Sequence, residues 1–321
     1  MRRRGLLAAG ACWGLLRESH GEGAFPARPI TLVVPFAPGG IADLTARTVS
    51  AVMARTLGQA IIVDNRPSAG SVVGSNAVAH SAADGYTLLL LSNANAVSTG
   101  LFRKLPFDVV RDFAPITTLA FFDLGVFVPE GSRFLSLKEL VAYAKDRPGT
   151  LTAGTISVGS TQHLAAELFK THAGIDMLIV PYKGTPAVQT ALRAGEIDVA
   201  FEILGPMLAQ AVAKVVRVLA VTSNRRYAAM PEVPTVIEAG VPGYVVASWN
   251  ALAAPTRTAP VVIERLHRAA VDAVAQPAVQ QRLLEFGARA ESGSPKQLES
   301  LLASEIKRWG EVIRVAKIEP E

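Results

Sequence analysis

The chain has 321 residues, of which half are hydrophobic and 18% are charged, and its formal net charge is +5. This composition excludes intrinsic disorder, and the length suffices for two domains or one large domain. Aromatic residues make up only 6%, and the body of the chain has no block rich in Lys and Arg, so we expect no nucleic-acid partner.

The first 24 residues have the pattern of an export signal. Three arginines at positions 2–4 precede the apolar stretch Gly5–Leu16, which is too short to span a bilayer. We therefore predict that residues 1–24 form a signal peptide, that the mature chain begins near Phe25, and that it works in the periplasm. The sequence leaves open Sec or twin-arginine export and a lipid anchor at Cys12. Because Cys12 is the only cysteine, we expect no disulfide and no thiolate metal site in the mature chain.

Strand and helix patterns alternate through most of the body. Short apolar runs are followed by apolar residues at helical spacing, and glycines end two of the helices, at Gly58 and Gly174. Thr185 has the residue type of a helix N-cap, with Pro186 at the first helical position. The alternation predicts an α/β fold with mainly parallel sheets. The predicted strands cover residues 30–34, 60–63, 86–91, 151–153, 177–180, 197–201 and 217–222.

The C-terminal part differs, because its pattern indicates helices without strands. The predicted helices run over residues 261–275, from Pro277 to Gly287, and from a capping-box sequence at Ser294 to about Val315. Such helices usually cover another element of the fold. We predict two lobes joined by crossing strands instead of two independent domains. The predicted lobes comprise residues 25–124 plus 250–321, and residues 125–249.

Small, polar or glycine-rich connections follow four of the predicted strands, where helices begin. In open α/β sheets, ligands bind at this edge, outside the carboxyl ends of the strands. The first turn of a helix leaves backbone N–H groups unpaired and carries a partial positive charge, and glycine lets a ligand approach. The arrangement favours a small carboxylate ligand. The candidate ligand-binding residues in these connections are Phe36, Ala37, Gly39, Gly40, Ser92, Asn93, Ser157, Gly159, Ser160, Thr161, Lys183 and Gly184.

Asp43 and His163 lie in the first turns of two of these helices and are further candidates. Each candidate also has a purely structural interpretation, and the sequence does not decide between the two. The structural alternatives are a tight turn at Gly39–Gly40, an acid that complements the helix N-terminus at Asp43, an N-cap at Ser160, a hydrogen-bonded histidine at His163 and a solvated cation at Lys183.

Signals of catalysis are weak. Ser157 and His163 could act as nucleophile and base, but no acidic residue that would orient the histidine is identifiable from the spacing. The five histidines lack the spacing of metal ligands, and the sequence has no P-loop and no GxGxxG motif. We therefore expect a binding protein with no catalytic residue, no metal and no cofactor. A serine hydrolase that uses Ser157 is the alternative.

Several ordered motifs resemble those of one receptor family. They include "RPITLVVPFAPGGIADLTAR", "GSTQHLAAELF", "VPYKGTPAVQTALRAGEIDVAF" and "LAVTSNRRYAAMPEVPTVIEAG". The chain is similar, from about Phe25 to its C-terminus, to the Bug-type or TctC-type extracytoplasmic solute receptors. These are the substrate-binding components of tripartite tricarboxylate transporters.

The resemblance implies a periplasmic-binding-protein fold of type II, with two α/β lobes that close on a carboxylate by a hinge and C-terminal helices that pack back. The loops matching residues 36–40 and 157–161 would grip one carboxylate from opposite lobes, and Asp43 matches an acidic family position. Where the family usually has aspartate, this chain has Glu202. The resemblance further implies a monomer that delivers its ligand to membrane permease subunits; an accessory protein of a sensor kinase is the alternative. The other end of the ligand would meet Ser92, Asn93, Lys183 and Glu202.

Overall fold

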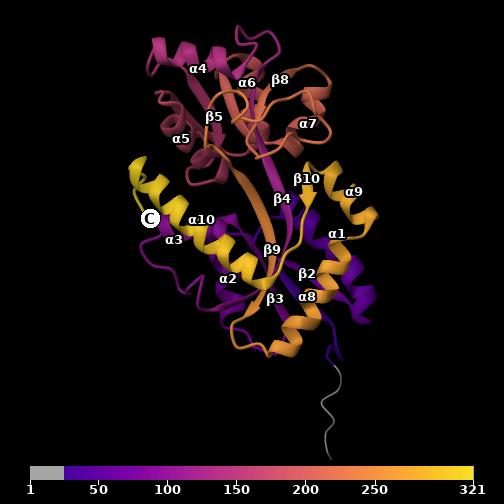
Figure 1. Ribbon diagram of the computed structural model, residues 1–321. Helices are drawn as coiled ribbons and strands as arrows, with labels where there is room; N and C mark the ends of the chain where they lie inside the picture. Colours follow the sequence, from indigo (N-terminus) through magenta and orange to yellow (C-terminus); the bar gives the residue numbers. More distant parts are fainter. Residues whose placement is uncertain (1–24, 321) are drawn as a thin grey trace, which may run out of the picture.

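The computed structural model describes residues 25–320. Figure 1 shows two α/β bodies, a lower and an upper one, joined by two long strands, β4 (Phe113–Pro129) and β9 (Ala247–Pro255). The predictions of a signal peptide over residues 1–24 and of a lipid anchor at Cys12 lie outside the described residues.

The sheet of the lower body has the order β2-β1-β3-β9-β4, with β10 paired to the far side of β4. Its first three strands are parallel, and both faces of β1 and β3 are buried, which explains their almost continuous apolar sequences. The strands of this sheet, other than the two long ones, are β1 (Ile30–Val34), β2 (Ile61–Asn65), β3 (Thr87–Ser92) and β10 (Ala288–Ala290).

Helices cover both faces of this lower sheet. One face packs into a hydrophobic core with α1, α8 and α9, and the other packs with α2, α3 and the long α10. The predicted helix C-termini at Gly58 and Gly287 and the predicted helix start at Ser294 are confirmed. The helices are α1 (Ile41–Leu57), η1 (Ala69–Ser71), α2 (Val72–Ala79), α3 (Asn93–Leu101), α8 (Pro260–Val274), α9 (Pro277–Glu285) and α10 (Pro295–Val315).

The upper body is built in the same way around β4. Strands β7, β5 and β6 extend the sheet from one edge of β4, and β8 pairs with its other edge. Its remaining strands are β5 (Thr152–Ile156), β6 (Leu178–Tyr182), β7 (Val199–Ile203) and β8 (Val216–Val221). Its helices are α4 (Leu137–Asp146), α5 (Thr161–Ala173), α6 (Thr185–Ala194) and α7 (Leu204–Val212).

The α/β architecture and its parallel strand pairs are confirmed, and three details differ from the sequence analysis. The two long strands pair antiparallel with each other, with β3 and with β7, which the alternating pattern did not predict. The C-terminal part contains a short strand, β10, in addition to its helices. The N-cap of α6 is Gly184, so the prediction that Thr185 caps this helix is wrong.

This arrangement brings the candidate connections to two edges. Parallel strands end on the same side, so β1 and β3 present the starts of α1 and α3 together, and β5 and β6 present the starts of α5 and α6. Within residues 25–320, we find no helix that combines the length and the apolar character needed to cross a bilayer.

Candidate functional site

The loop between β1 and α1 presents backbone rather than side chains. Residues 37–40 are exposed, and α1 begins after Gly40 without a described side chain that caps the N–H groups of its first turn. Gly39 has a φ of 78°, in the left-handed region that favours glycine, whereas Gly40 has an extended backbone with φ −77°. A ligand can therefore reach the unpaired N–H groups at the start of α1.

The buried side chain of Asp43 stabilises the loop between β1 and α1. Its carboxylate is almost fully buried and accepts hydrogen bonds from Gly39 N at 2.9 Å, from Arg47 Nε at 3.0 Å and from Asn65 Nδ2 at 3.0 Å. Burial alone would raise the pKa of Asp43, but the hydrogen bonds from Arg47, Gly39 and Asn65 outweigh it and lower that pKa. Asp43 thus holds the glycine turn in shape, with each carboxylate oxygen already accepting two hydrogen bonds.

Asn93, directly after β3, joins the two bodies. Its side chain is fully buried, and its Nδ2 donates to Thr161 Oγ1 at 2.9 Å, so the start of α3 touches the start of α5. Its Oδ1 accepts a hydrogen bond from Trp309 Nε1 of α10 at 2.8 Å. The neighbouring Ser92 is also buried, and its N–H donates to Asn95 Oδ1 at 3.0 Å. Both buried residues therefore stabilise the start of α3 by hydrogen bonds.

The loop between β5 and α5 is closed by its own hydrogen bonds. Ser160 is the N-cap: its hydroxyl accepts from His163 N at 3.1 Å and donates to Ile156 O at 2.8 Å. Gly159 has a φ of 77°, and a Cβ there would lie 2.2 Å from Leu101, the last residue of α3. Gly159 N donates to His163 Nδ1 at 3.4 Å, and burial, with the charge of Lys170, lowers the pKa of His163. His163 is thus a neutral part of the loop framework.

Ser157 does not form a catalytic pair with His163. Ser157 is exposed, and no hydrogen bond joins its hydroxyl to His163 among the described residues. Within residues 25–320, there is also no group of three or more His, Cys, Asp or Glu side chains that could hold a metal ion.

The connection between β6 and α6 is again open. Lys183 is exposed and makes no ion pair with any residue that the structure describes. Gly184, the N-cap of α6, has a φ of 119°, and no described side chain caps this helix start. Lys183 and the first N–H groups of α6 are therefore available to a second negative group of a ligand.

Glu202, at the end of β7, accepts hydrogen bonds from residues at the starts of α5, α6 and α7. Its carboxylate accepts from Gln162 Nε2 at 3.2 Å, from Thr185 Oγ1 at 3.1 Å and from Ile203 N at 3.1 Å. The side chain is fully buried, and no Lys, Arg or His of the described chain pairs with it. Burial consequently raises the pKa of Glu202 to about 7, against the opposing effect of these hydrogen bonds.

The structure brings some candidates together and leaves others apart. Asn93 meets Thr161 across the two bodies, and Glu202 meets the starts of α5 and α6. Within residues 25–320, no hydrogen bond links loop 36–40 to loop 157–161. The sequence analysis missed Trp309, Asn65 and Gln162. The spacing of Asp43 and Arg47, four residues apart on one helix, was the only available sign of the support beneath the glycine turn.

Comparisons with known proteins identify the family and the fold of this chain. A family described as "Tripartite tricarboxylate transporter family receptor" matches residues 45–318. The R. palustris protein Rpa4515, solved with adipate, is 33% identical with a TM-score of 0.81 over 92% of this chain and 100% of that chain. MatC from Rhodopseudomonas palustris, solved with bound malate, is 31% identical with a TM-score of 0.76 over 90% and 100%. The periplasmic binding protein BugD is 27% identical with a TM-score of 0.77 over 92% and 100%.

Proposed function

Because this chain belongs to the tripartite tricarboxylate transporter receptor family, whose members are non-enzymatic binding proteins, we propose that it is a periplasmic receptor for a small dicarboxylate. It holds the ligand between the lower and the upper body and delivers it to the membrane subunits of a tripartite transporter. We further propose that the two bodies act as the lobes 25–124 plus 250–321 and 125–249, hinged at β4 and β9.

The observation that carries this proposal is the pair of uncapped helix starts. Helices α1 and α6 begin after Gly40 and Gly184, and no described side chain caps either of them. Both starts therefore offer unpaired N–H groups and a partial positive charge, one from each body. Two such sites suit a ligand with a carboxylate at each end, and Lys183 adds a cation beside the second one. Adipate and malate, which occupy two similar proteins, are dicarboxylates.

Substitution of Gly40 tests this proposal cleanly. Gly40 has an extended backbone that valine also adopts, and an added Cβ would meet only Ala37 O, at 3.5 Å. The Gly40→Val variant should therefore fold, and its branched side chain should stand where a carboxylate approaches the start of α1. We expect calorimetry with adipate and with malate to show a ligand for the wild-type chain and a loss of at least about tenfold in its affinity for Gly40→Val.

Gly131→Val is the matched control. Gly131 also has open space around its Cβ position and no positive φ, and it lies in the loop after β4, away from the candidate connections. It should retain wild-type affinity, and circular dichroism should show both variants folded. Unchanged affinity of a folded Gly40→Val variant would contradict the proposed place of the carboxylate.

A further inference from the structure

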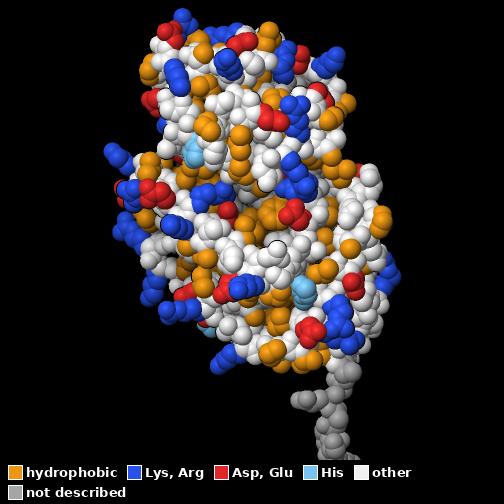
Figure 2. Space-filling view, viewed as in Figure 1, with side chains coloured by type: hydrophobic (Ala, Val, Ile, Leu, Met, Phe, Trp, Pro, Cys, Tyr) orange, Lys and Arg blue, Asp and Glu red, His pale blue; other side chains and the backbone are white. Residues whose placement is uncertain are grey.

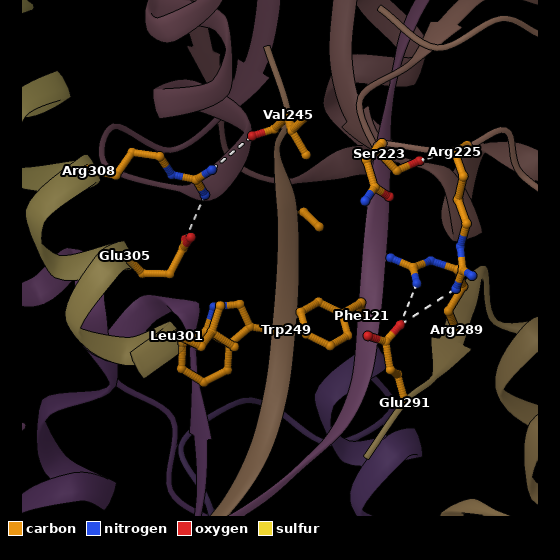
Figure 3. Close-up of a pocket in the computed structure, with 12 residues that line it drawn as sticks. Phe121, Ser223, Arg225, Val245, Trp249, Arg289, Glu291, Leu301, Glu305 and Arg308 are labelled. Atoms are coloured by element: carbon orange, nitrogen blue, oxygen red, sulfur yellow. Dashed lines mark hydrogen bonds and ion pairs between the residues drawn. The ribbon is translucent and has the colours of Figure 1, made fainter. Parts of the chain in front are cut away.

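A second binding site is suggested by a cavity of about 380 Å³ between the two bodies. Its floor comes from β4 and β9, its upper wall from the loop after β8, and its lower walls from the segment around β10 and from α10 (Figure 3). Figure 2 shows the hollow on this face, with hydrophobic side chains at its floor and charged ones around its rim. None of its lining residues belongs to the four candidate connections. The sheet order places β1 and β3 on one flank of β9 and places β10 beyond β4.

Two residues in the walls of this cavity have buried hydrogen-bond donors without an acceptor in residues 25–320. Trp249 is 1% exposed, and its Nε1 has no hydrogen-bond partner within the described part of the chain. The same holds for Nε of Arg308, whose other nitrogens donate to Val245 O at 2.8 Å and to Glu305 at 2.6 Å. Both nitrogens are buried inside the walls, so an acceptor oxygen of a bound molecule reaches them only if the walls move.

The charged side chains that line the cavity indicate which charge a ligand should carry. Arg289 is held by Glu291 at 2.7 Å and by Asp123 at 3.3 Å, and Arg308 is held by Glu305. Arg225 is the exception, because its nearest carboxylate oxygen, on Glu291, lies 3.5 Å away and is shared with Arg289. The contact between Arg225 and Glu291 is the longest of these ion pairs, and the Arg225 side chain is exposed, so its guanidinium is the one best able to turn toward an anion in the cavity.

The floor of the cavity sets the shape of the ligand. The rings of Phe121 and Trp249 lie side by side at the floor, and Leu301 adds an aliphatic wall (Figure 3). We propose that this cavity is a second binding site, which takes a small aromatic monocarboxylate with its ring against Phe121 and Leu301 and its carboxylate toward Arg225.

A chain of hydrogen bonds connects the cavity to helix starts of the proposed dicarboxylate site. Arg308 donates to Glu305, and Trp309 donates to both Glu305 and Asn93 at 2.8 Å. Asn93 in turn donates to Thr161 at the start of α5. The cavity walls also come from both bodies, so hinge bending changes its dimensions. A molecule bound there shifts the open–closed equilibrium, and the two ligands change each other's affinity by the same factor.

Tryptophan fluorescence of the full chain tests this proposal, with benzoate as the probe. Of the three tryptophans, Trp249 lines the cavity and Trp309 belongs to the hydrogen-bonded connection. We expect benzoate to give a saturable change in fluorescence. We expect about tenfold weaker binding of benzamide, which has the same shape without the charge, and of benzoate to Arg225→Gln. Ala247→Leu, which fills the cavity from β9, should abolish the response.

Two further variants separate this site from the cleft. Arg268→Gln, which also removes an exposed, ion-paired arginine but on α8, should bind benzoate as the wild type does. Gly40→Val should also keep benzoate binding, whatever it does to dicarboxylates. The absence of a saturable response would show that the cavity holds only water. Loss of the response in Gly40→Val together with its retention in Ala247→Leu would show that benzoate uses the cleft. Either result would overturn the proposal.

Discussion

Replacement of Glu202 by glutamine should remove part of the pH dependence of the free energy of unfolding. The carboxylate of Glu202 is fully buried and accepts three hydrogen bonds, but no described cation balances its charge. Glutamine has the same shape and stays neutral. Its carbonyl oxygen can accept from Gln162 and Ile203 N, and its amide can donate to the hydroxyl of Thr185. The Glu202→Gln variant should therefore fold with the same contacts.

The magnitude of the effect follows from the pKa of Glu202. Burial raises this pKa from its ordinary value of 4.5 to about 7, so the folded chain binds the proton more tightly than the unfolded chain. The stabilisation from this proton is complete below about pH 4.5 and is lost as the pH rises through about 7. At 1.36 kcal/mol per pKa unit the shift corresponds to about 3 kcal/mol, of which about 2.5 kcal/mol falls between about pH 5 and about pH 8.

Urea unfolding of both proteins, followed by circular dichroism at these two pH values, measures the effect. Glu202→Gln should gain about 2.5 kcal/mol in free energy of unfolding relative to the wild type between about pH 5 and about pH 8. Every other titrating group is common to both proteins and cancels in this difference. If the difference between the two proteins is the same at both pH values, Glu202 does not titrate in this range, and the argument from its burial is wrong.

Three further predictions concern the cleft. Ser160→Ala should lower the free energy of unfolding by about 1 kcal/mol in urea titrations, because it removes the N-cap of α5. The binding free energy of the dicarboxylate, measured by calorimetry, should change by less than this amount. Lys183→Ala should weaken the binding of adipate by about 1 kcal/mol and leave the binding of hexanoate, which has one carboxylate, almost unchanged. Equal losses for both acids would show that Lys183 does not contact the second carboxylate. Saturating dicarboxylate should reduce the radius of gyration in X-ray scattering, and an unchanged radius would contradict closure at β4 and β9.

The sequence predicted those helix termini that depend only on residues close together in the chain. Gly58 and Gly174 end helices in the left-handed conformation, and Ser294 caps α10 with the expected partner Gln297, because such termini depend on residues within a single turn. The same rules could not tell Gly39 from Gly40, although only Gly39 has a positive φ. Thr185 has the residue type of an N-cap, yet its hydroxyl donates to Glu202 instead, since a partner from β7 is within reach.

Features that depend on contacts between distant segments were not predictable. Trp309 meets Asn93 across 216 positions, and Glu202 meets Gln162 across 40, so no spacing reveals either pair. The short strand β10 forms only because β4 offers it an edge. The cavity has walls from both bodies and from α10, so it exists only once the bodies are placed relative to one another.

The four helix starts, alike in sequence, differ in one respect that bears on the ligand. Ser160 caps α5, and Asn93 at the start of α3 is buried and already bonded at both ends of its side chain. A carboxylate there would have to displace existing hydrogen bonds. At α1 and α6 no described side chain competes, and glycine at each N-cap removes the steric obstacle. The two carboxylates of a ligand should therefore lie at α1 and α6, so the reach between these two starts in the closed state sets the length of diacid that fits.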